Sequence, residues 1–406
     1  MPMKMQLLSA HAAAVTRVAF TGDSRWFVTT GLDGIAHLWN LATLDPTHTP
    51  VVLSGHSDGI RTVLPTPDSR RIITGSLDRT ARIWDLPGLA APGAATILPD
   101  HNPYSPMSVS ADSRLLAAGR RNHSVRCYRL RGGGLEGSGT SLRGPQRGIC
   151  AVAFSPDSTW LAAAAVGEAV FVWKLAPAGE CMEPLVLPTG DQIAHTVAFG
   201  PTSDSLIASD YNAIRLWRLN MDGSAQERDP LHRHKDAILG FVVSRNRRWL
   251  VSYSADNNAC VWDLALEEPS QGSRLLQGHR APLVSAAISP DDRWLASGDT
   301  AGAVRLWELT AQDPAERVTE FSVHRGLANH IAFSPDSRWL ATGSGYWDSS
   351  AGDPRVMLWD LLQDGTLFPV ELTAHRADIV DLAFSADGNW LGTGSADGTA
   401  CIWSDF

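Results

Sequence analysis

Histidine, a hydroxyl residue, aspartate and tryptophan recur together at fixed spacings along the chain. Four segments place a His 28 residues before a Trp, an Asp six residues before that Trp, and a Ser or Thr four residues before the Asp. The four sets are His11, Thr29, Asp33 and Trp39; His56, Thr74, Asp78 and Trp84; His234, Ser252, Asp256 and Trp262; and His375, Thr393, Asp397 and Trp403. A hydroxyl, an imidazole and a carboxylate could act as nucleophile, base and orienting group. Because an active site is rarely built four times in one chain, we interpret the sets as structural.

Tryptophan also gives the length of the repeating unit. Eight Trp residues, with Tyr128 filling one gap, each end an alternating apolar run, and the steps are 44 or 45 residues except for one of 52. The repeats end near residues 40, 85, 129, 174, 218, 263, 308, 360 and 404. Such a period is typical of repeat architectures. Nine repeats cover the chain, so the sequence predicts a single domain over residues 1–406.

The local patterns inside each repeat are those of β-strands. Segments such as VTRVAF (15–20) and RWLATGS (338–344) are rich in strand-forming residues, and a Pro-Asp or Ala-Asp turn separates such pairs. Asp-Gly pairs such as Asp33-Gly34 stand between the second and third apolar runs, which is a strong hairpin signal. No segment has helical periodicity. The sequence therefore predicts an all-β fold.

Two short motifs identify the repeat. Gly-His occurs at Gly55-His56 and Gly278-His279, and Trp-Asp occurs at Trp84-Asp85, Trp262-Asp263 and Trp359-Asp360. With these motifs the sequence resembles the WD-repeat (WD40) β-propeller family over roughly residues 4–406. The resemblance implies a single closed β-propeller of four-stranded blades, with nine blades predicted and seven or eight as the fallback. It also implies that the N-terminal segment 4–9 supplies the fourth strand of the last blade, and that the four His–hydroxyl–Asp–Trp sets are buried hydrogen-bond networks.

Several repeats depart from this pattern. Repeat 7 has Ala301 where Asp is expected, and repeats 3, 4 and 5 lack most of the set, with Tyr128 in the Trp position of repeat 3. Two interpretations stay open: neutral drift in a redundant repeat, or an arc of blades specialised for a partner.

Candidate partner-binding residues come from three features. Repeat 8 carries an insertion with an aromatic pair beside a charge, Tyr346-Trp347-Asp348, which is the kind of anchor enriched at interface hot spots. Residues 114–147 contain eight Arg and one acid, among them Arg120 and Arg121, and could dock an acidic partner or simply be solvated surface. The family resemblance adds contact positions near the repeat His and the turn Asp, namely Arg61, Tyr104, His195, Asp210, Asn329 and Asp378.

Other classes of site are not indicated. The formal net charge is −9, which disfavours a general nucleic-acid or anionic-membrane binder, and there is no apolar run long enough to cross a membrane. No phosphate-loop, hydrolase or zinc-protease motif occurs, so no catalytic residue, cofactor, metal or small-molecule substrate is predicted. The five Cys are widely spaced without a C-x-x-C pair, which favours a reducing cytoplasm. The scarcity of Lys relative to Arg, with abundant Ala, points weakly to a GC-rich bacterial gene.

Together these patterns predict a non-catalytic scaffold for protein–protein recognition whose partner is unknown. The alternative is a sensor or regulatory subunit that works with a separate effector such as a protease or NTPase. A propeller enzyme with a site at the central channel is a third, less favoured reading. Fold alone does not decide among them.

Overall fold

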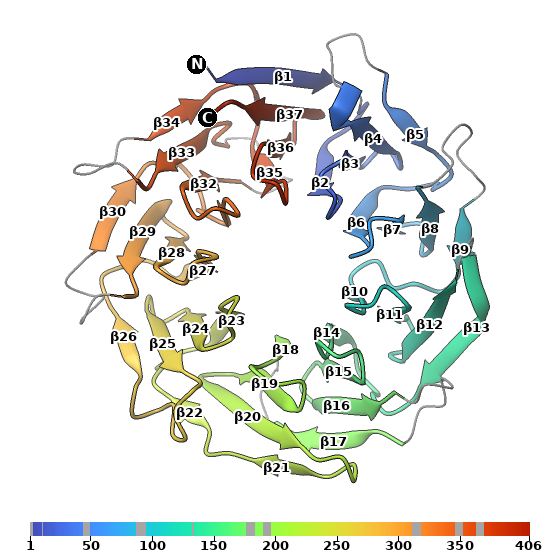
Figure 1. Ribbon diagram of the computed structural model, residues 1–406, viewed down its shortest axis with the longest axis vertical. Helices are drawn as coiled ribbons and strands as arrows, with labels where there is room; N and C mark the ends of the chain where they lie inside the picture. The colour runs from blue at the N-terminus through green and yellow to red at the C-terminus, as the bar shows by residue number, and fades with distance from the viewer. Residues whose placement is uncertain are drawn as a thin grey trace. The chain divides into compact units, whose positions relative to one another are not determined.

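The computed structural model describes residues 3–9, 11–43, 49–86, 95–131, 134–175, 183–189, 196–310, 318–345, 352–362 and 369–406. Within these residues the strands form nine antiparallel sheets that follow one another along the chain, and they are the blades of an all-β propeller (Figure 1). The predicted fold class and the count of nine are confirmed. One short 3₁₀ helix, η1 (Leu41–Thr43), follows the third strand of blade 1.

Blades 1, 2, 7, 8 and 9 each contain four strands in the described residues. Their strands are β2 (Val15–Phe20), β3 (Trp26–Gly31), β4 (Ala36–Asn40) and β5 (Val51–Leu53) in blade 1; β6 (Ile60–Pro65), β7 (Arg71–Ser76), β8 (Ala81–Asp85) and β9 (Thr96–Leu98) in blade 2; β27 (Leu283–Ile288), β28 (Trp294–Asp299), β29 (Ala303–Glu308) and β30 (Val318–Ser322) in blade 7; β31 (His330–Phe333), β32 (Trp339–Gly343), β33 (Val356–Asp360) and β34 (Val370–Leu372) in blade 8; and β35 (Ile379–Phe384), β36 (Leu391–Ser395), β37 (Thr399–Ser404) and β1 (Lys4–Ser9) in blade 9.

Blades 3 to 6 follow the same order, and blade 5 has a fifth strand. Their strands are β10 (Met107–Val109), β11 (Leu115–Gly119), β12 (Val125–Arg131) and β13 (Gly134–Leu142) in blade 3; β14 (Ile149–Phe154), β15 (Trp160–Ala165), β16 (Ala169–Lys174) and β17 (Leu185–Pro188) in blade 4; β18 (Val197–Phe199), β19 (Ser205–Asp210), β20 (Ala213–Leu219), β21 (Ala225–Glu227) and β22 (Leu231–His232) in blade 5; and β23 (Ile238–Val243), β24 (Trp249–Ser254), β25 (Ala259–Asp263) and β26 (Arg274–Leu276) in blade 6. The extra strand arises because both β21 and β22 pair with β20.

Two compact units make up the chain. One comprises residues 1–95 and 277–406, and the other comprises residues 96–276. The single domain over residues 1–406 stays a prediction. In the first unit β1 pairs with β37 in antiparallel register from Lys4↔Ser404 to Ser9↔Thr399. The N-terminal segment therefore supplies the outermost strand of blade 9, as the sequence predicts, and the two ends of the chain share one sheet (Figure 1).

The turn between the first and second strands of a blade is built from a hydroxyl and a carboxylate. In blade 2, Thr66 Oγ1 donates to Asp68 Oδ1 at 2.6 Å, and the same carboxylate oxygen accepts from the Arg70 amide at 3.1 Å. Ser69 between them takes a positive φ of 56°. Short polar side chains that bond the local backbone favour such turns. The Pro-Asp and Ala-Asp pairs of the sequence thus mark where one strand reverses into the next.

The core lies between neighbouring sheets, and the second strand of every blade is mostly buried. Every residue of β7 is buried, and so is every residue of β15, whose sequence is WLAAAA. Between blades 1 and 2, Leu38 packs in one apolar cluster with Ile72 and Trp84. Strands covered on both faces lose the apolar–polar alternation of a half-exposed sheet, which explains these continuous apolar runs.

Hydrogen bonds from hydroxyls of first strands tie adjacent blades together in the first unit. Thr16 Oγ1 in β2 donates to the Ile60 carbonyl of blade 2 at 2.6 Å, and Ser285 Oγ in β27 donates to the Ala328 carbonyl of blade 8 at 2.5 Å. Both hydroxyl residues are buried. A buried hydrogen bond of this kind holds two blades in one register, because breaking it would leave polar groups unpaired away from water.

Candidate interaction site

The His–hydroxyl–Asp–Trp sets are compact hydrogen-bond networks. In blade 2, His56 Nδ1 lies 2.8 Å from Asp78 Oδ2 and His56 Nε2 lies 2.8 Å from Thr74 Oγ1, while Trp84 Nε1 donates to the same hydroxyl at 3.0 Å. A carboxylate only accepts, so Nδ1 carries the proton and Nε2 accepts from the hydroxyl. Burial lowers the pKa of His56, against the raising effect of Asp78, which keeps the ring neutral.

Blades 1 and 6 repeat this geometry. His11 lies 3.0 Å from Asp33 Oδ2 and 2.9 Å from Thr29 Oγ1, and Trp39 donates to that hydroxyl at 3.3 Å. The matching distances in blade 6 are 3.1 Å for His234 to Asp256, 2.8 Å for His234 to Ser252 and 3.0 Å for Trp262 to Ser252. The imidazole side chains of His11 and His234 are 1% and 0% exposed. A substrate therefore has no access to these groups.

Blade 9 inserts a second hydroxyl into the network. His375 Nε2 lies 2.8 Å from Thr393 Oγ1, and Trp403 Nε1 donates to that oxygen at 3.2 Å. His375 Nδ1, however, lies 2.8 Å from Thr399 Oγ1 and 4.0 Å from Asp397 Oδ1. Thr399 donates to Asp397 Oδ1 at 2.5 Å, so it stands between the ring and the carboxylate.

Blades 7 and 8 carry networks that spacing alone does not reveal in full. In blade 7, where Ala301 occupies the turn position, His279 Nδ1 lies 2.7 Å from Asp299 Oδ2, and Trp307 Nε1 donates to Ser297 Oγ at 2.9 Å. In blade 8, His324 lies 2.8 Å from Thr342 Oγ1 and 3.3 Å from Asp353 Oδ2.

Blades 3 to 5 keep fragments of the pattern. In blade 4, Glu168 accepts from the amides of Gln146 and Arg147 at 3.0 and 3.2 Å, which replaces the carboxylate contact to the connection before the first strand. In blade 5, Asp210 is 7% exposed and accepts from Arg215 Nε at 2.6 Å, so this candidate contact residue is engaged in a nearly buried ion pair.

The remaining candidates from the sequence fall at different places. His195 and the insertion residues Tyr346, Trp347 and Asp348 lie outside the described residues. Tyr104 is 73% exposed. Asp378 is buried, so it does not present its carboxylate to solvent.

The arginine-rich segment does not form one continuous strip in blade 3. Arg114 directly precedes β11, whereas Arg120 and Arg121 directly follow it, so they lie at opposite ends of the strand. Arg120 is bound to Asp100 at 2.5 Å and its side chain is only 13% exposed. Arg121 is exposed. The exposed Arg114 and Arg121 therefore lie at opposite ends of β11.

A pocket of about 240 Å³ lies among the first strands of blades 8, 9, 1 and 2, all in the first unit. We call it the first-strand pocket. Its lining residues are Thr16, Arg17, Arg61, Asn329, His330, Gly345 and Val380. Four of these, Thr16, Arg61, Asn329 and Val380, stand five residues after the His of their repeats. The pocket thus brings together Arg61 and Asn329, which the sequence singles out in separate repeats.

Asn329 and His330 hold the rim of the pocket at Gly345. Asn329 Nδ2 donates to the Gly345 carbonyl at 2.7 Å, and the Gly345 amide faces Asn329 Oδ1 at 3.3 Å. The Nε2 atom of His330 is shielded from solvent and has no hydrogen-bond partner among the described residues. Burial, with a further contribution from the charge of Arg17, lowers the pKa of His330 to about 4, so its ring is neutral at pH 7.

Asp381 directly follows the lining residue Val380 but does not line the pocket itself. Its Oδ2 accepts from the Val18 amide of blade 1 and its Oδ1 from its neighbour Leu382, both at 3.0 Å. Burial raises the pKa of Asp381 to about 6, although the backbone donors and the charge of Arg17 oppose the shift. Arg17 itself donates to the Thr16 carbonyl at 3.0 Å and is exposed at the pocket.

Arg17, His330 and Asp381 were not recognised as site residues from the sequence. Each stands six residues after the His of its repeat, and the corresponding residue of blade 6 is Gly240. Comparison of this one position, six residues after the repeat His, between the repeats would have revealed a His, an Asp and an Arg in three consecutive blades.

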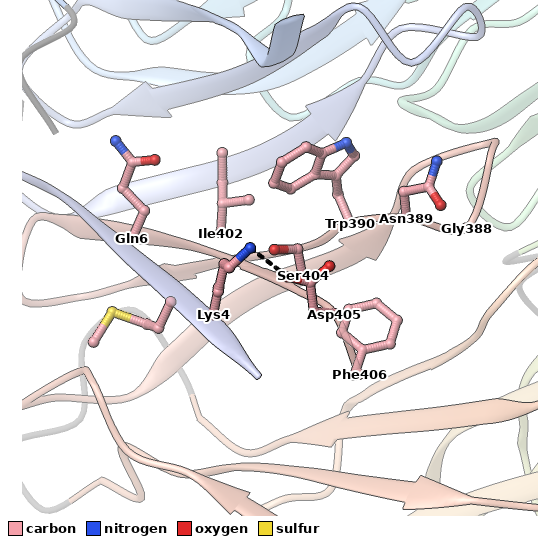
Figure 2. Close-up of a pocket in the computed structure, with 10 residues that line it drawn as sticks. Lys4, Gln6, Gly388, Asn389, Trp390, Ile402, Ser404, Asp405 and Phe406 are labelled. Carbon is pink, nitrogen blue, oxygen red and sulfur yellow. Dashed lines mark ion pairs between the residues drawn. The ribbon is translucent and has the colours of Figure 1, made fainter. Parts of the chain in front are cut away.

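A second, larger cavity of about 710 Å³ lies along β1 and β37 (Figure 2). Lys4 and Asp405 form an ion pair at 2.9 Å beside it, and Trp390 and Phe406 supply its aromatic surface. Because its two charged residues neutralise each other, this cavity offers less for recognition than the first-strand pocket does.

Comparison with known families matches seven of the nine repeats. The family described as "WD domain, G-beta repeat" matches residues 3–40, 46–85, 138–174, 226–263, 271–308, 315–360 and 368–404. The chain belongs to the WD-repeat family. The stretches 86–137 and 175–225 are left unmatched, and they contain repeats 3 and 5, in which the hydrogen-bond network is lost.

One curated protein shares a short segment with this WD-repeat chain. It is "Target of rapamycin complex subunit wat1" from Schizosaccharomyces pombe, 34% identical over 55 residues, which is 14% of this chain and 18% of that protein. The match spans little more than one repeat, so it supports the repeat type. Among the described residues no helix is long and apolar enough to cross a membrane, and no group of three potential metal ligands occurs.

Proposed function

We propose that this WD-repeat protein is a non-catalytic scaffold for protein–protein recognition, and that a partner binds at the first-strand pocket. The observation that carries the proposal is the convergence of Arg17, Arg61, Asn329 and His330 from three blades on one cavity. Polar groups of this variety, placed at positions that differ between repeats, suit recognition of one partner better than a general packing role.

The physical basis of such binding is preorganisation. Thr16 ties blade 1 to blade 2, Asp381 ties blade 9 to blade 1, and Asn329 fixes the backbone of Gly345. Groups already held in place lose little conformational entropy when a partner binds. Gly345 also directly precedes Tyr346 and Trp347 in the sequence, so we include this aromatic pair in the proposed interaction surface.

A non-catalytic role is favoured because the repeated His–hydroxyl–Asp groups are buried and mutually satisfied. In blade 2 the Thr74 hydroxyl already contacts both His56 and Trp84. A nucleophile needs access to its substrate. We also propose a reducing cytoplasmic setting, since Cys260 and Cys401 are buried free thiols. The bacterial origin stays a prediction from composition.

The alternative function is a regulatory subunit of a larger effector complex, and the match to a complex subunit gives it some support. Affinity capture from a lysate of the source organism tests both. The bait proteins are the wild type, the Arg17→Glu/Arg61→Glu variant, the Tyr346→Ala/Trp347→Ala variant and Arg121→Glu.

Arg25→Glu is the matched control. Arg25 is exposed in the segment between β2 and β3, whereas Arg17 lies near the start of β2. We expect one protein to be captured by the wild type and the control and lost with the Arg17/Arg61 variant. Stoichiometric recovery with a protease or NTPase would favour the regulatory subunit. Capture of no stoichiometric protein, by a folded bait, would contradict the scaffold function.

A further inference from the structure

We infer that the first-strand pocket binds the carboxylate of an Asp or Glu side chain in an acidic segment of the protein partner. This inference rests on the proposed scaffold function and adds the chemistry of the partner to it. The proposed ligand is an extended acidic peptide segment that inserts one side chain between Arg17 and Arg61.

The wall of the pocket is cationic. Arg17 and Arg61 come from the first strands of adjacent blades, and no carboxylate is among the lining residues that the structure describes. The Asp381 carboxylate is near enough to offset part of the positive charge of Arg17. Both of its oxygens, however, accept from backbone amides at 3.0 Å. Arginine recognises carboxylates through paired N–H donors in a planar fork. Two guanidinium groups on one cavity therefore favour an anionic side chain.

His330 can accept a hydrogen bond from a donor in the same ligand. The ring is neutral at pH 7, so only one of its two nitrogens carries a proton. That proton stays on the nitrogen that is hydrogen-bonded to the Gly345 backbone, and the unpartnered Nε2 therefore offers a lone pair. A carboxylate alone cannot satisfy this atom. An acidic residue within a peptide brings both groups, because its side chain accepts from arginine while a main-chain N–H can donate to Nε2.

The size of the pocket separates a side chain from a larger ligand. Its volume is about 240 Å³, below the roughly 300–1,000 Å³ of pockets that enclose drug-sized molecules and cofactors. One Asp or Glu residue fits such a cavity with its main-chain N–H turned toward His330, and the rest of the peptide lies across the exposed rim beside Arg17.

Selection from a phage-displayed library of random heptapeptides on the full-length protein tests the inference. We expect wild-type protein to enrich peptides with Asp or Glu at one fixed position. The best synthetic peptide should bind Arg17→Gln or Arg61→Gln protein at least about tenfold more weakly, and Arg25→Gln protein with unchanged affinity. Its binding should also weaken as salt is raised, because charge pairs at a partly exposed site are screened.

His330→Phe provides a second readout that is independent of charge. Phe keeps a planar ring but has no lone pair, so it should weaken the peptide several-fold while leaving the melting temperature of the free protein close to that of wild type. Melting temperatures of the arginine variants establish that they are folded. A folded His330→Phe variant with wild-type affinity would argue against the main-chain contact.

Three results of these peptide experiments would overturn the inference. They are selection of peptides without a fixed acidic position, peptide binding that is indifferent to both Arg17 and Arg61, and binding of inorganic phosphate in calorimetry when no acidic peptide binds. A lysate partner that is captured equally by wild-type and Arg17/Arg61 variants would remove the acidic-segment inference but leave the scaffold function. Absence of any partner would remove the scaffold function itself.

Discussion

Asp299 Oδ2 lies 2.7 Å from His279 Nδ1, although Asp299 stands two positions before the turn aspartate of the other networks. It is the last residue of β28, and its Oδ1 accepts from the amides of Ala301 and Ala303, both at 2.9 Å. Its carboxylate thus performs from the strand the two contacts that Asp78 performs from the turn: it holds the imidazole and it closes the hairpin backbone.

Replacing Asp299 by Ala should destabilise the protein by about 3 kcal/mol. The change leaves the His279 N–H and two backbone amides without their acceptor in a site where Asp299 is 1% exposed. The double variant Asp299→Ala/Ala301→Asp should recover part of this loss, because it restores a carboxylate at the usual turn position. Urea unfolding of both variants measures the effect. Equal stability of Asp299→Ala and wild type would refute the assigned role.

Stability should fall as the pH is lowered from 7 to 5. The pKa values of His375 and His330 are lowered to about 4 by burial, and burial also lowers the pKa of His11, His56, His234 and His279. The unfolded chain takes up protons below about pH 6.5, whereas the folded rings take them up only at lower pH, so protonation favours unfolding. For His375 the loss is about 2 kcal/mol at pH 5.

Asp381 acts in the opposite direction, since its pKa is raised to about 6 and the folded state gains its proton first on acidification. One carboxyl group offsets only part of the effect of six imidazoles. Melting temperatures between pH 7.5 and 4.5 check the prediction. His375→Gln should flatten the profile, whereas replacement of His232, which is exposed, should not. A wild-type melting temperature that is independent of pH would contradict it.

The number of blades and the closing strand were predictable because both follow from the period of the sequence. Trp39 and its equivalents recur at nearly constant intervals, and residues 4–9 fill the strand that the ninth repeat lacks. The role of Asp299 was not predicted in this way, because a spacing rule considers only the position of a residue along the chain. A side chain that starts two residues earlier can reach the same imidazole when the hairpin brings both positions together.

The first-strand pocket was only half predictable for a related reason. Arg61 and Asn329 stand at family contact positions, but the pocket is made by strands from four repeats that are far apart in sequence. The proximity of His330 and Arg17, which lie in repeats 8 and 1, depends on the pairing of β1 with β37 in blade 9. Periodicity predicts that pairing; it does not say which non-repeated side chains then meet.

The bond between Ser285 and the Ala328 carbonyl should contribute about 1 kcal/mol to stability. Ser285→Ala removes the donor and leaves that carbonyl without this partner at the junction of blades 7 and 8. Ser322→Ala is the matched control, because Ser322 is exposed on the fourth strand of the same blade. Urea unfolding should separate the two variants. If they are equally stable, the bond between the blades contributes nothing measurable.

Trp359→Phe should cost less stability than Trp262→Phe. Both indoles are fully buried third-strand residues, so the two changes remove similar apolar area. Trp262 Nε1 donates to Ser252 Oγ at 3.0 Å, whereas Trp359 Nε1 has no hydrogen-bond partner among the described residues. Phe at position 262 therefore breaks a buried hydrogen bond, while Phe at position 359 removes a donor that is already unsatisfied. We expect a difference of about 1–3 kcal/mol in the free energy of unfolding, measured by urea titration, and equal losses would show that the indole of Trp359 is hydrogen-bonded in solution.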